Sequence, residues 1–366
     1  MVNGAAVSIQ DVVVGAYRIP TDAPESDGTI AWDATTIIVA EVLAGNQCGL
    51  GYAYADAAAA QLIENTLASV VEGRDAMAVP GTWQAMVEAV RNLGRPGIAS
   101  SAIAALDIAL WDLKARLLGV SLATLLGPVR EGIAIYGSGG FTSYDLERLQ
   151  AQLGGWADAG IAMVKMKVGR EPDRDDERVA LAREAIGEEC ELFVDANGAY
   201  ERKQALAMAE FFAQQRVSWF EEPVSSDDLA GLRLLRDRAP AGMAIAAGEY
   251  GYTLNYFRRM LEAGAVDVLQ ADVTRCAGIT ELLRVGALCA AHEVPLSAHT
   301  APSIHAHAGC AIAPMVHLEY FHDHVRIERM LFDGVLEPEG GVLAPDLSSP
   351  GLGLELRRVD AEAYAL

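Results

Sequence analysis

The sequence predicts an α/β protein in which a closed (β/α) barrel follows a smaller N-terminal α+β domain. The first observation is that eight short apolar runs alternate with amphipathic helical stretches between residues 132 and 320, which is typical of repeated βα units and a parallel sheet. The second is that no GxGxxG sequence follows the first run, although a doubly wound sheet usually carries one there. Eight strand candidates in fewer than 200 residues therefore favour a closed barrel.

The N-terminal region, up to about residue 95, mixes β-rich runs such as TTIIVAEVLA with helical stretches. The segments SDGT and AGNQCGLG supply the turn chemistry between them. We expect a small α+β module here. Residues 21–32, TDAPESDGTIAW, are polar and contain proline and glycine, so we expect a loop that lies at the surface or over a site.

The eight apolar runs mark the barrel strands. In chain order they are GIAIYGSGG, AMVKMKVG, ELFVDANG, VSWFEEP, MAIAAGEY, VDVLQAD, EVPLSAH and HLEY. The last seven each end in a polar or charged residue, about one βα unit apart. These residues are Lys167, Asp195, Glu221, Glu249, Asp272, His299 and Glu319. Because active sites of barrels are built at the C-terminal ends of the strands, we expect these side chains to converge.

Composition and charge restrict the partners. The chain of 366 residues is 52% hydrophobic and 21% charged, as in ordinary globular proteins. Its net charge of -22 would repel a phosphate backbone, so nucleic acid is not an expected partner. The chain has five scattered cysteines without CxxC spacing, which predicts reduced thiols in a cytoplasm. Its first residues include no basic segment and it has no uninterrupted apolar span, so we expect a protein that does not enter membranes.

Three of the strand-end residues predict a metal site. Asp195, Glu221 and Glu249 come from successive strands and offer only oxygen ligands, which suits a hard cation such as Mg²⁺. Three carboxylates crowded at a barrel mouth would repel one another without a cation. The sequence therefore predicts one Mg²⁺ held by these three residues.

Two groups of bases are expected beside this metal. Lys165 and Lys167 point to the same side of their strand, and we expect each to depress the pKa of the other, which favours a neutral amine. Asp272 and His299 end adjacent strands, so the carboxylate can fix the tautomer of the ring. Bases on two sides of a metal-bound substrate suit removal of a proton next to a carboxylate. Glu319 could add a hydrogen bond to that carboxylate if it is protonated.

The histidine-rich segment LSAHTAPSIHAHAG allows a different reading, because His305 and His307 form an HxH pair like that of zinc hydrolases on the same barrel. That resemblance requires the pair at the end of the first strand, whereas here it follows the seventh. We therefore expect structural or supporting roles for His305 and His307, and only His299 to act in catalysis.

These motifs together resemble the enolase superfamily and, within it, the mandelate racemase group. VKMKVG resembles the KxK motif of that group, VDANG, FEEP and AAGEY its three metal-ligand motifs, and Asp272 with His299 its Asp-His dyad. The resemblance implies a (β/α)7β modified TIM barrel with an N-terminal α+β capping domain. It also implies that Lys167 and His299 are the bases on the two faces and that Lys165 steadies the substrate carboxylate. Asn197 and Glu319 occupy substrate-contacting positions.

The resemblance further implies three parts, namely a capping domain over residues 1–127, a barrel over 128–329 and a C-terminal segment over 330–366 that returns to the capping domain. Residues 21–32 and 49–55 resemble the loops that set specificity. The implied reaction is dehydration of a sugar acid to a 2-keto-3-deoxy acid. The alternative is a racemase or epimerase of a 2-hydroxy acid, and a muconate-type cycloisomerase would need a lysine where Asp272 stands. A small carboxylate substrate and a homo-oligomer, from dimer to octamer, are the expected partners.

Overall fold

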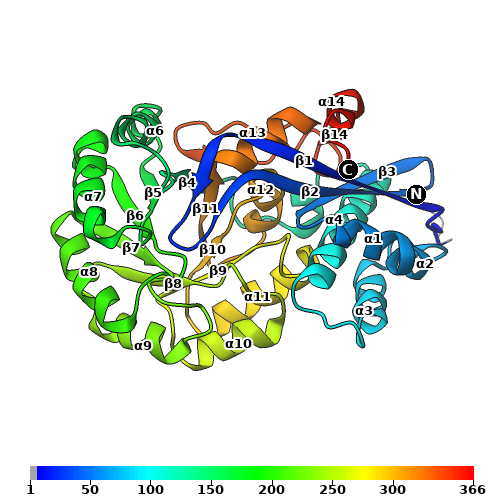
Figure 1. The fold of residues 1–366 in the computed structure, drawn as a ribbon. Helices are drawn as coiled ribbons and strands as arrows, with labels where there is room; N and C mark the ends of the chain where they lie inside the picture. The colour runs from blue at the N-terminus through cyan, green and yellow to red at the C-terminus, as the bar shows by residue number, and fades with distance from the viewer. Residues whose placement is uncertain (1–5) are drawn as a thin grey trace.

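A parallel eight-stranded barrel forms the larger part of the protein in the computed structural model, which describes residues 6–366 (Figure 1). The barrel strands are β4 (Ile133–Gly139), β5 (Met163–Lys167), β6 (Glu191–Asp195), β7 (Val217–Glu221), β8 (Ala244–Ala247), β9 (Val268–Ala271), β10 (Leu296–Ala298) and β11 (Met315–Phe321). The barrel closes where β11 pairs with β4 in parallel, and β13 (Val342–Leu343) adds an antiparallel partner to β4. All eight predicted strands are confirmed.

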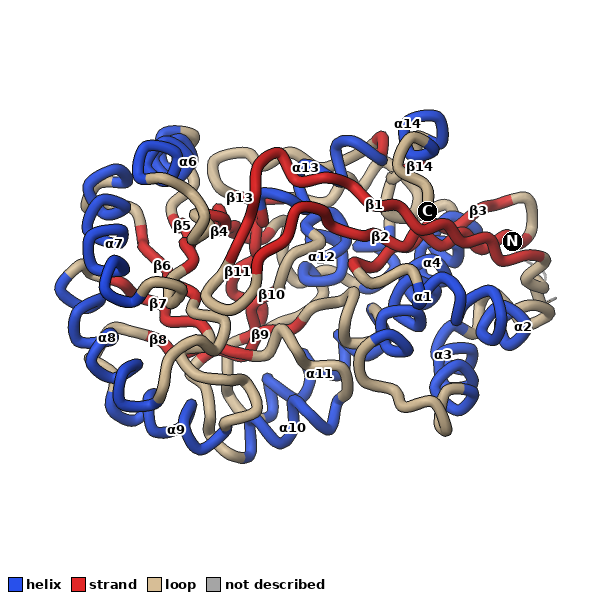
Figure 2. Tube along the Cα trace, in the orientation of Figure 1, coloured by secondary structure: helices blue, strands red, loops and turns tan. Residues whose placement is uncertain are grey.

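Seven helices connect these strands and surround the barrel, as the outer ring of helices in Figure 2 shows. They are α6 (Leu146–Asp158), α7 (Pro172–Ile186), α8 (Arg202–Gln214), α9 (Leu229–Arg238), α10 (Leu254–Glu262), α11 (Ile279–Ala291) and α12 (Pro302–Cys310). Local chemistry sets several of their starts: the side chains of Asp145, Asp228 and Thr253 each accept a hydrogen bond from a backbone N–H in the first turn. The predicted modified barrel is confirmed, and α13 (His322–Leu331) follows its last strand.

The capping domain packs a three-stranded antiparallel sheet on helices. Its strands are β1 (Asp11–Ser26), β2 (Ala31–Ala44) and β3 (Gln47–Tyr54), and its helical elements are α1 (Ala58–Leu62), η1 (Ile63–Leu67), α2 (Ala68–Val71), α3 (Val79–Ala89), α4 (Ile98–Leu118) and α5 (Leu122–Leu126). Helix α4 lies tightly against β3, since a Cβ added to Gly51 would stand 2.2 Å from the carbonyl oxygen of Ala105. Glycine at this position therefore permits the close approach of helix and sheet.

The expectation of a loop over residues 21–32 is wrong in its extent. Strand β1 continues to Ser26 and β2 begins at Ala31, so only residues 27–30 lie outside the strands. The register of the pairing shifts between Pro20 and Glu25, which accommodates the proline in the hairpin. The resulting β1–β2 hairpin extends from the capping domain toward the barrel (Figure 1).

The hairpin is attached to the mouth of the barrel by hydrogen bonds at its tip. Thr142, which follows β4, donates its backbone N–H to the carbonyl of Ser26 at 2.8 Å and its hydroxyl to the carbonyl of Asp27 at 2.9 Å. These bonds hold residues 26–27 at the C-terminal end of the barrel strands. The capping domain therefore contributes directly to the walls of whatever site the barrel mouth contains.

The C-terminal segment lies beside the N-terminal sheet. It contains β12 (Phe332–Asp333), β14 (Glu355–Leu356) and α14 (Arg358–Glu362), and its end pairs with β1. The backbone N–H of Arg18 donates to the carbonyl of Tyr364, and that of Leu366 donates to the carbonyl of Ala16. Over residues 6–366 no helix is both long and apolar enough to cross a membrane.

Candidate active site

Three buried carboxylates meet at the C-terminal ends of consecutive strands. Asp195 and Glu221 are the last residues of β6 and β7, and Glu249 follows β8. One oxygen from each lies within 4.8 Å of those of the other two. An all-oxygen set with this spacing fits a hard divalent cation such as Mg²⁺, as the sequence predicts. The neighbouring Glu222 is also buried, and burial together with the charge of Glu249 raises its pKa well above the usual range.

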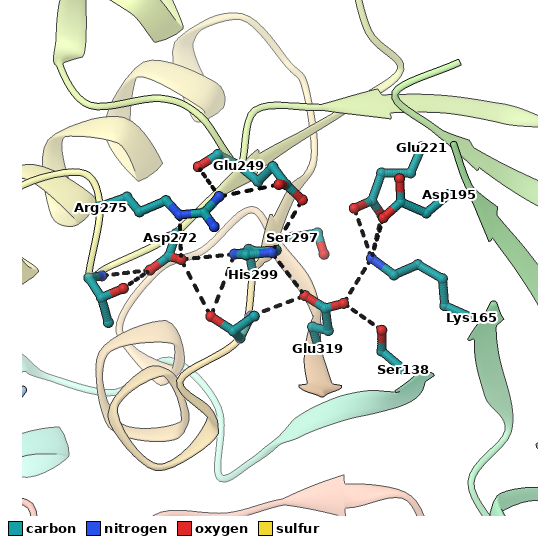
Figure 3. Close-up of polar contacts among 12 residues, drawn as sticks. Ser138, Lys165, Asp195, Glu221, Glu249, Asp272, Arg275, Ser297, His299 and Glu319 are labelled. Carbon is teal, nitrogen blue, oxygen red and sulfur yellow. Dashed lines mark hydrogen bonds and ion pairs between the residues drawn. The ribbon is translucent and has the colours of Figure 1, made fainter. Parts of the chain in front are cut away.

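The two lysines of β5 are buried among these carboxylates. Lys165 donates to both oxygens of Glu221 at 2.8 and 2.7 Å and lies 2.8 Å from Glu319, while Lys167 donates to Asp195 (Figure 3 shows the Lys165 contacts). Burial lowers the pKa of both lysines, but the nearby carboxylates more than offset this and raise it. In this arrangement the carboxylates outweigh the mutual repulsion of the lysines, which was expected to favour a neutral amine.

His299 and Asp272 form the predicted dyad. Nδ1 of His299 lies 2.8 Å from Oδ2 of Asp272, and Nε2 lies 3.2 Å from Glu249 and 3.5 Å from Glu319 (Figure 3). Burial lowers the pKa of His299, but the charges of Glu249 and Glu319 outweigh it and raise the pKa to about 10. With Nδ1 bound to Asp272, Nε2 is the nitrogen that can exchange a proton with a ligand.

Glu319 lies between the lysine and the histidine. It accepts a hydrogen bond from the hydroxyl of Ser138 at 2.6 Å and one from the backbone N–H of Thr300 at 3.2 Å. Burial raises its pKa, but Lys165 and His299 outweigh this and lower it to about 2. The hydrogen bond from Glu319 to a substrate carboxylate was predicted only for a protonated Glu319, and this arrangement favours the ionised form, which accepts hydrogen bonds and cannot donate one.

A cavity of about 400 Å³ opens over these groups and is lined by Lys167, Glu249, Asp272 and His299. Asn197 also lines it, and its buried Oδ1 lacks a hydrogen-bond partner within the described chain. The cavity thus contains both candidate bases, one metal ligand and an unpaired amide oxygen. Lys167 ends β5 and His299 follows β10. In the closed barrel, two strands lie between β5 and β10 on one side and four on the other, so the two residues stand on different sides of the mouth.

Several residues of the cavity were not found by sequence reasoning. Arg275, in the turn after β9, donates to Glu249 at 3.2 Å and stacks over Tyr250 with its guanidinium carbon 5.0 Å from the ring centre. Its place three residues after Asp272 was the only sequence signal. His324 comes from α13, and only the folded chain brings it to the cavity. Tyr54 also lines the cavity and lies within residues 49–55, which the resemblance assigned to specificity.

His305 and His307 do not join the site. Nδ1 of His305 lies 2.7 Å from the carbonyl of Thr300, and its Nε2 accepts the backbone N–H of Val273 at 3.1 Å. Nδ1 of His307 accepts the backbone N–H of Ala123 at 3.3 Å. Both nitrogens of His305 are therefore used to hold loops, and neither histidine belongs to a metal-capable group found among residues 6–366.

A barrel with a carboxylate triad, a buried lysine and an Asp-His dyad at one mouth belongs to the class of metal-dependent enzymes that remove a proton next to a carboxylate. Family models identify the family. The Enolase C-terminal domain-like model matches residues 148–361, and the mandelate racemase / muconate lactonizing enzyme N-terminal domain model matches residues 26–127. The chain belongs to the mandelate racemase group of the enolase superfamily, which confirms the resemblance seen in the sequence.

Characterised relatives match most of the chain. A 3,6-anhydro-α-L-galactonate cycloisomerase of Streptomyces coelicolor is 32% identical over 96% of this chain and 98% of its own. An L-talarate/galactarate dehydratase of Salmonella typhimurium is 31% identical over 91% of this chain and 85% of its own. An arabinonate dehydratase of Saccharolobus solfataricus is 29% identical over 90% of both.

Solved structures share the fold across almost the whole chain. A mandelate racemase/muconate lactonizing enzyme-like protein from Rubrobacter xylanophilus is 59% identical, with a TM-score of 0.96 over 98% of this chain and 100% of its own. A racemase from Streptomyces coelicolor with bound magnesium is 29% identical, with a TM-score of 0.92 over 98% and 100%. A mutant L-talarate/galactarate dehydratase with magnesium and L-glucarate has 28% identity and a TM-score of 0.90 over 100% of this chain and 95% of its own.

Proposed function

We propose that the protein is a Mg²⁺-dependent lyase that dehydrates a sugar acid to a 2-keto-3-deoxy acid. The observation that carries this proposal is that Lys167 and His299 line one cavity together with the metal ligand Glu249. The sugar acid dehydratases among the relatives support the choice of reaction. Asp195, Glu221 and Glu249 would hold the Mg²⁺, whose positive charge would weaken the ion pair of Lys167 with Asp195 and stabilise negative charge on the substrate carboxylate.

The side chains divide the proton transfers between them. Lys167, as the free amine, takes the α-proton on one face, while Lys165 steadies the substrate carboxylate from within its pair with Glu221. His299, protonated on Nε2, gives a proton to the departing 3-hydroxyl, which leaves as water when the C3–O bond breaks. The resulting enol then becomes the 2-keto acid by taking a proton at C3 and releasing the proton of its C2 hydroxyl. The bond of Nδ1 to Asp272, whose charge stabilises the protonated ring, supports His299 as the acid.

The remaining site residues act on these groups. Asp272 holds His299 in one tautomer through the bond to Nδ1. Glu319 keeps Lys165 charged and in place, and Asn197 offers its unpaired oxygen to a substrate hydroxyl. We therefore propose catalytic roles for Lys167, His299, Asp272, Lys165 and Glu319. Substrate binding is proposed for Lys165, Asn197 and Glu319.

Racemisation or epimerisation is the second candidate, because the same two bases allow it. In that reaction His299 returns the proton to the α-carbon from the opposite face, and no C–O bond breaks. The similarity to a racemase of known structure keeps this reaction open. Cycloisomerisation is a third candidate through the cycloisomerase relative, although a muconate-type enzyme would need a lysine where Asp272 stands.

A screen of mono- and diacid sugars with Mg²⁺ in D₂O tests the proposal. Dehydration yields a 2-keto acid, racemisation yields α-deuterium without keto acid, and cycloisomerisation of anhydro or lactone substrates yields an isomer of unchanged mass apart from deuterium. If a broad library gives neither deuterium incorporation nor keto acid, proton abstraction is refuted.

We also propose the division into residues 1–127, 128–329 and 330–366, supported by the pairing of the chain end with β1. Residues 1–5 of the first part lie outside the described residues. The proposal further includes a cytoplasmic homo-oligomer that binds neither nucleic acid nor membranes. The net charge of -22 supports the exclusion of nucleic acid.

A further inference from the structure

We propose that the substrate has a single carboxylate, bound at the metal end of the cavity, and that its far end is a hydroxyl-bearing carbon recognised by Asp27. The substrate class is then the aldonic acids, which end in an alcohol, rather than the aldaric acids, which end in a second carboxylate. This inference rests on the function proposed above, because it assumes that the cavity holds a sugar acid.

The two ends of the cavity differ in charge. At the metal end, the cations Lys167 and Arg275 line the cavity, and both are paired with carboxylates. The wall supplied by the capping domain and α13 carries the carboxylates of Asp27 and Asp56, and the described residues that line it include no lysine or arginine. A second substrate carboxylate at this wall would meet negative charge without a cation to pair with, which excludes such ligands by repulsion.

Asp27 is held so that one of its oxygens stays free. The backbone N–H groups of Thr29 and Ile30 donate to Oδ1 at 2.6 and 2.8 Å, which fixes the turn at the tip of the hairpin. Within residues 6–366, Oδ2 has no hydrogen-bond partner, and the residue lines the cavity while only 5% exposed. A fixed carboxylate oxygen of this kind accepts a hydrogen bond from a hydroxyl and has nothing to give to a carboxylate.

Two other polar groups of the same wall, Trp32 and Thr35, have already used their donors inside the protein. The indole N–H of Trp32 donates to Glu25 at 2.8 Å, and the hydroxyl of Thr35 donates to Asp323 at 2.5 Å. The oxygen of Thr35 therefore retains only lone pairs for a ligand. Both Asp27 and Thr35 thus require a donor from the substrate, and a sugar hydroxyl supplies one.

His324 is the titratable group of this wall that would add positive charge if it were protonated. Its ring stacks on Tyr54 with centroids 3.4 Å apart, and its buried Nδ1 makes no hydrogen bond in the described chain. Burial and then the charge of His299 lower its pKa to about 3. The ring is therefore neutral at working pH and adds no positive charge to the wall.

The test compares pairs of five- and six-carbon sugar acids that share their stereochemistry and differ only in the last carbon, an alcohol or a carboxylate. With Mg²⁺ present, we expect kcat/KM for 2-keto acid formation to favour the alcohol member of an active pair by on the order of a hundredfold. Asp27→Asn retains an oxygen to accept from the turn and removes the charge. We expect it to lower kcat/KM for the aldonate roughly tenfold, mainly by raising KM. The ratio of kcat/KM for the aldonate to that for the aldarate should also become smaller.

Asp33→Asn is the matched control, because it removes a charge from the same hairpin at a side chain that is 86% exposed and pairs with Arg18. We expect it to leave kcat/KM unchanged for both the aldonate and the aldarate. Equal turnover of aldarate and aldonate by the wild-type enzyme would overturn the inference, even if Asp27→Asn did not fold, while leaving the proposed function intact. If no member of any pair gives keto acid or deuterium exchange, the proposed function falls and the inference with it.

Discussion

Nδ1 of His299 lies 2.8 Å from Oδ2 of Asp272, and the two residues follow the neighbouring strands β10 and β9. Thr274 donates its backbone N–H and its hydroxyl to the other oxygen of Asp272, each at 2.7 Å. The carboxylate therefore cannot rotate freely, and the ring it holds keeps Nε2 toward the cavity. Asp272 therefore fixes which nitrogen of His299 can exchange a proton with the substrate.

Asp272→Asn should reduce turnover strongly while the fold is retained. An amide can present its NH₂ to Nδ1, which would place the ring proton on Nε2 without the charge that stabilises imidazolium. We expect kcat to fall at least about a hundredfold. Steady-state kinetics and circular dichroism check this, with Asp227→Asn, an exposed position after β7, as the control. Turnover within twofold of wild type would argue against the dyad.

Lys167→Ala and His299→Asn should separate the two proton transfers. Each is expected to lower turnover at least about a hundredfold, because each removes one acid–base group. If Lys167 takes the α-proton, His299→Asn should still exchange that proton for deuterium in D₂O although dehydration is lost, and Lys167→Ala should do neither. Exchange that persists in Lys167→Ala and disappears in His299→Asn would reverse the two roles.

Mg²⁺ should stabilise the folded protein through the triad. A ligand that binds only the native state adds about 2.7 kcal/mol at a hundred times its Kd, so the unfolding temperature should rise with Mg²⁺ concentration. Glu249→Gln should weaken this dependence, because it removes one of three charged ligands. Calorimetry with and without EDTA measures the effect, and Asp227→Asn again serves as the control. An equal response in Glu249→Gln would place the metal elsewhere.

The strand-end pattern made most of the site predictable. Asp195, Glu221 and His299 stand at or directly after the ends of short apolar runs, so their convergence follows from barrel geometry alone. The charge state of Lys167 was not predictable, because it depends on its contact with Asp195 on the next strand and not on spacing along its own. Asp27 lies within residues 21–32, which the resemblance assigned to specificity, but the sequence did not single it out, since only the long β1–β2 pairing carries it to the cavity.

The buried carboxyl group of Glu25, on the β1–β2 hairpin, should make the free energy of unfolding fall as pH rises. The residue is 1% exposed, Trp32 donates to its Oε2, and its Oε1 has no hydrogen-bond partner within residues 6–366. Burial, aided by the charge of Asp323, raises its pKa from 4.5 to about 8. The folded protein then binds the proton more tightly than the unfolded chain, so the stabilisation present below pH 4.5 is lost as pH rises toward 8.

Glu25→Gln should remove this dependence, because the glutamine oxygen still accepts the indole N–H of Trp32 while no buried charge forms at high pH. The difference in the free energy of unfolding, variant minus wild type, should therefore increase by on the order of 2–4 kcal/mol from acid pH to pH 8. Urea unfolding at several pH values measures this difference. Asp33→Asn, the control, removes an exposed carboxylate from the same hairpin, and its stability should depend on pH as that of the wild type does. If the stability of Glu25→Gln also followed the wild-type pH dependence, Glu25 would be ionised in the folded protein.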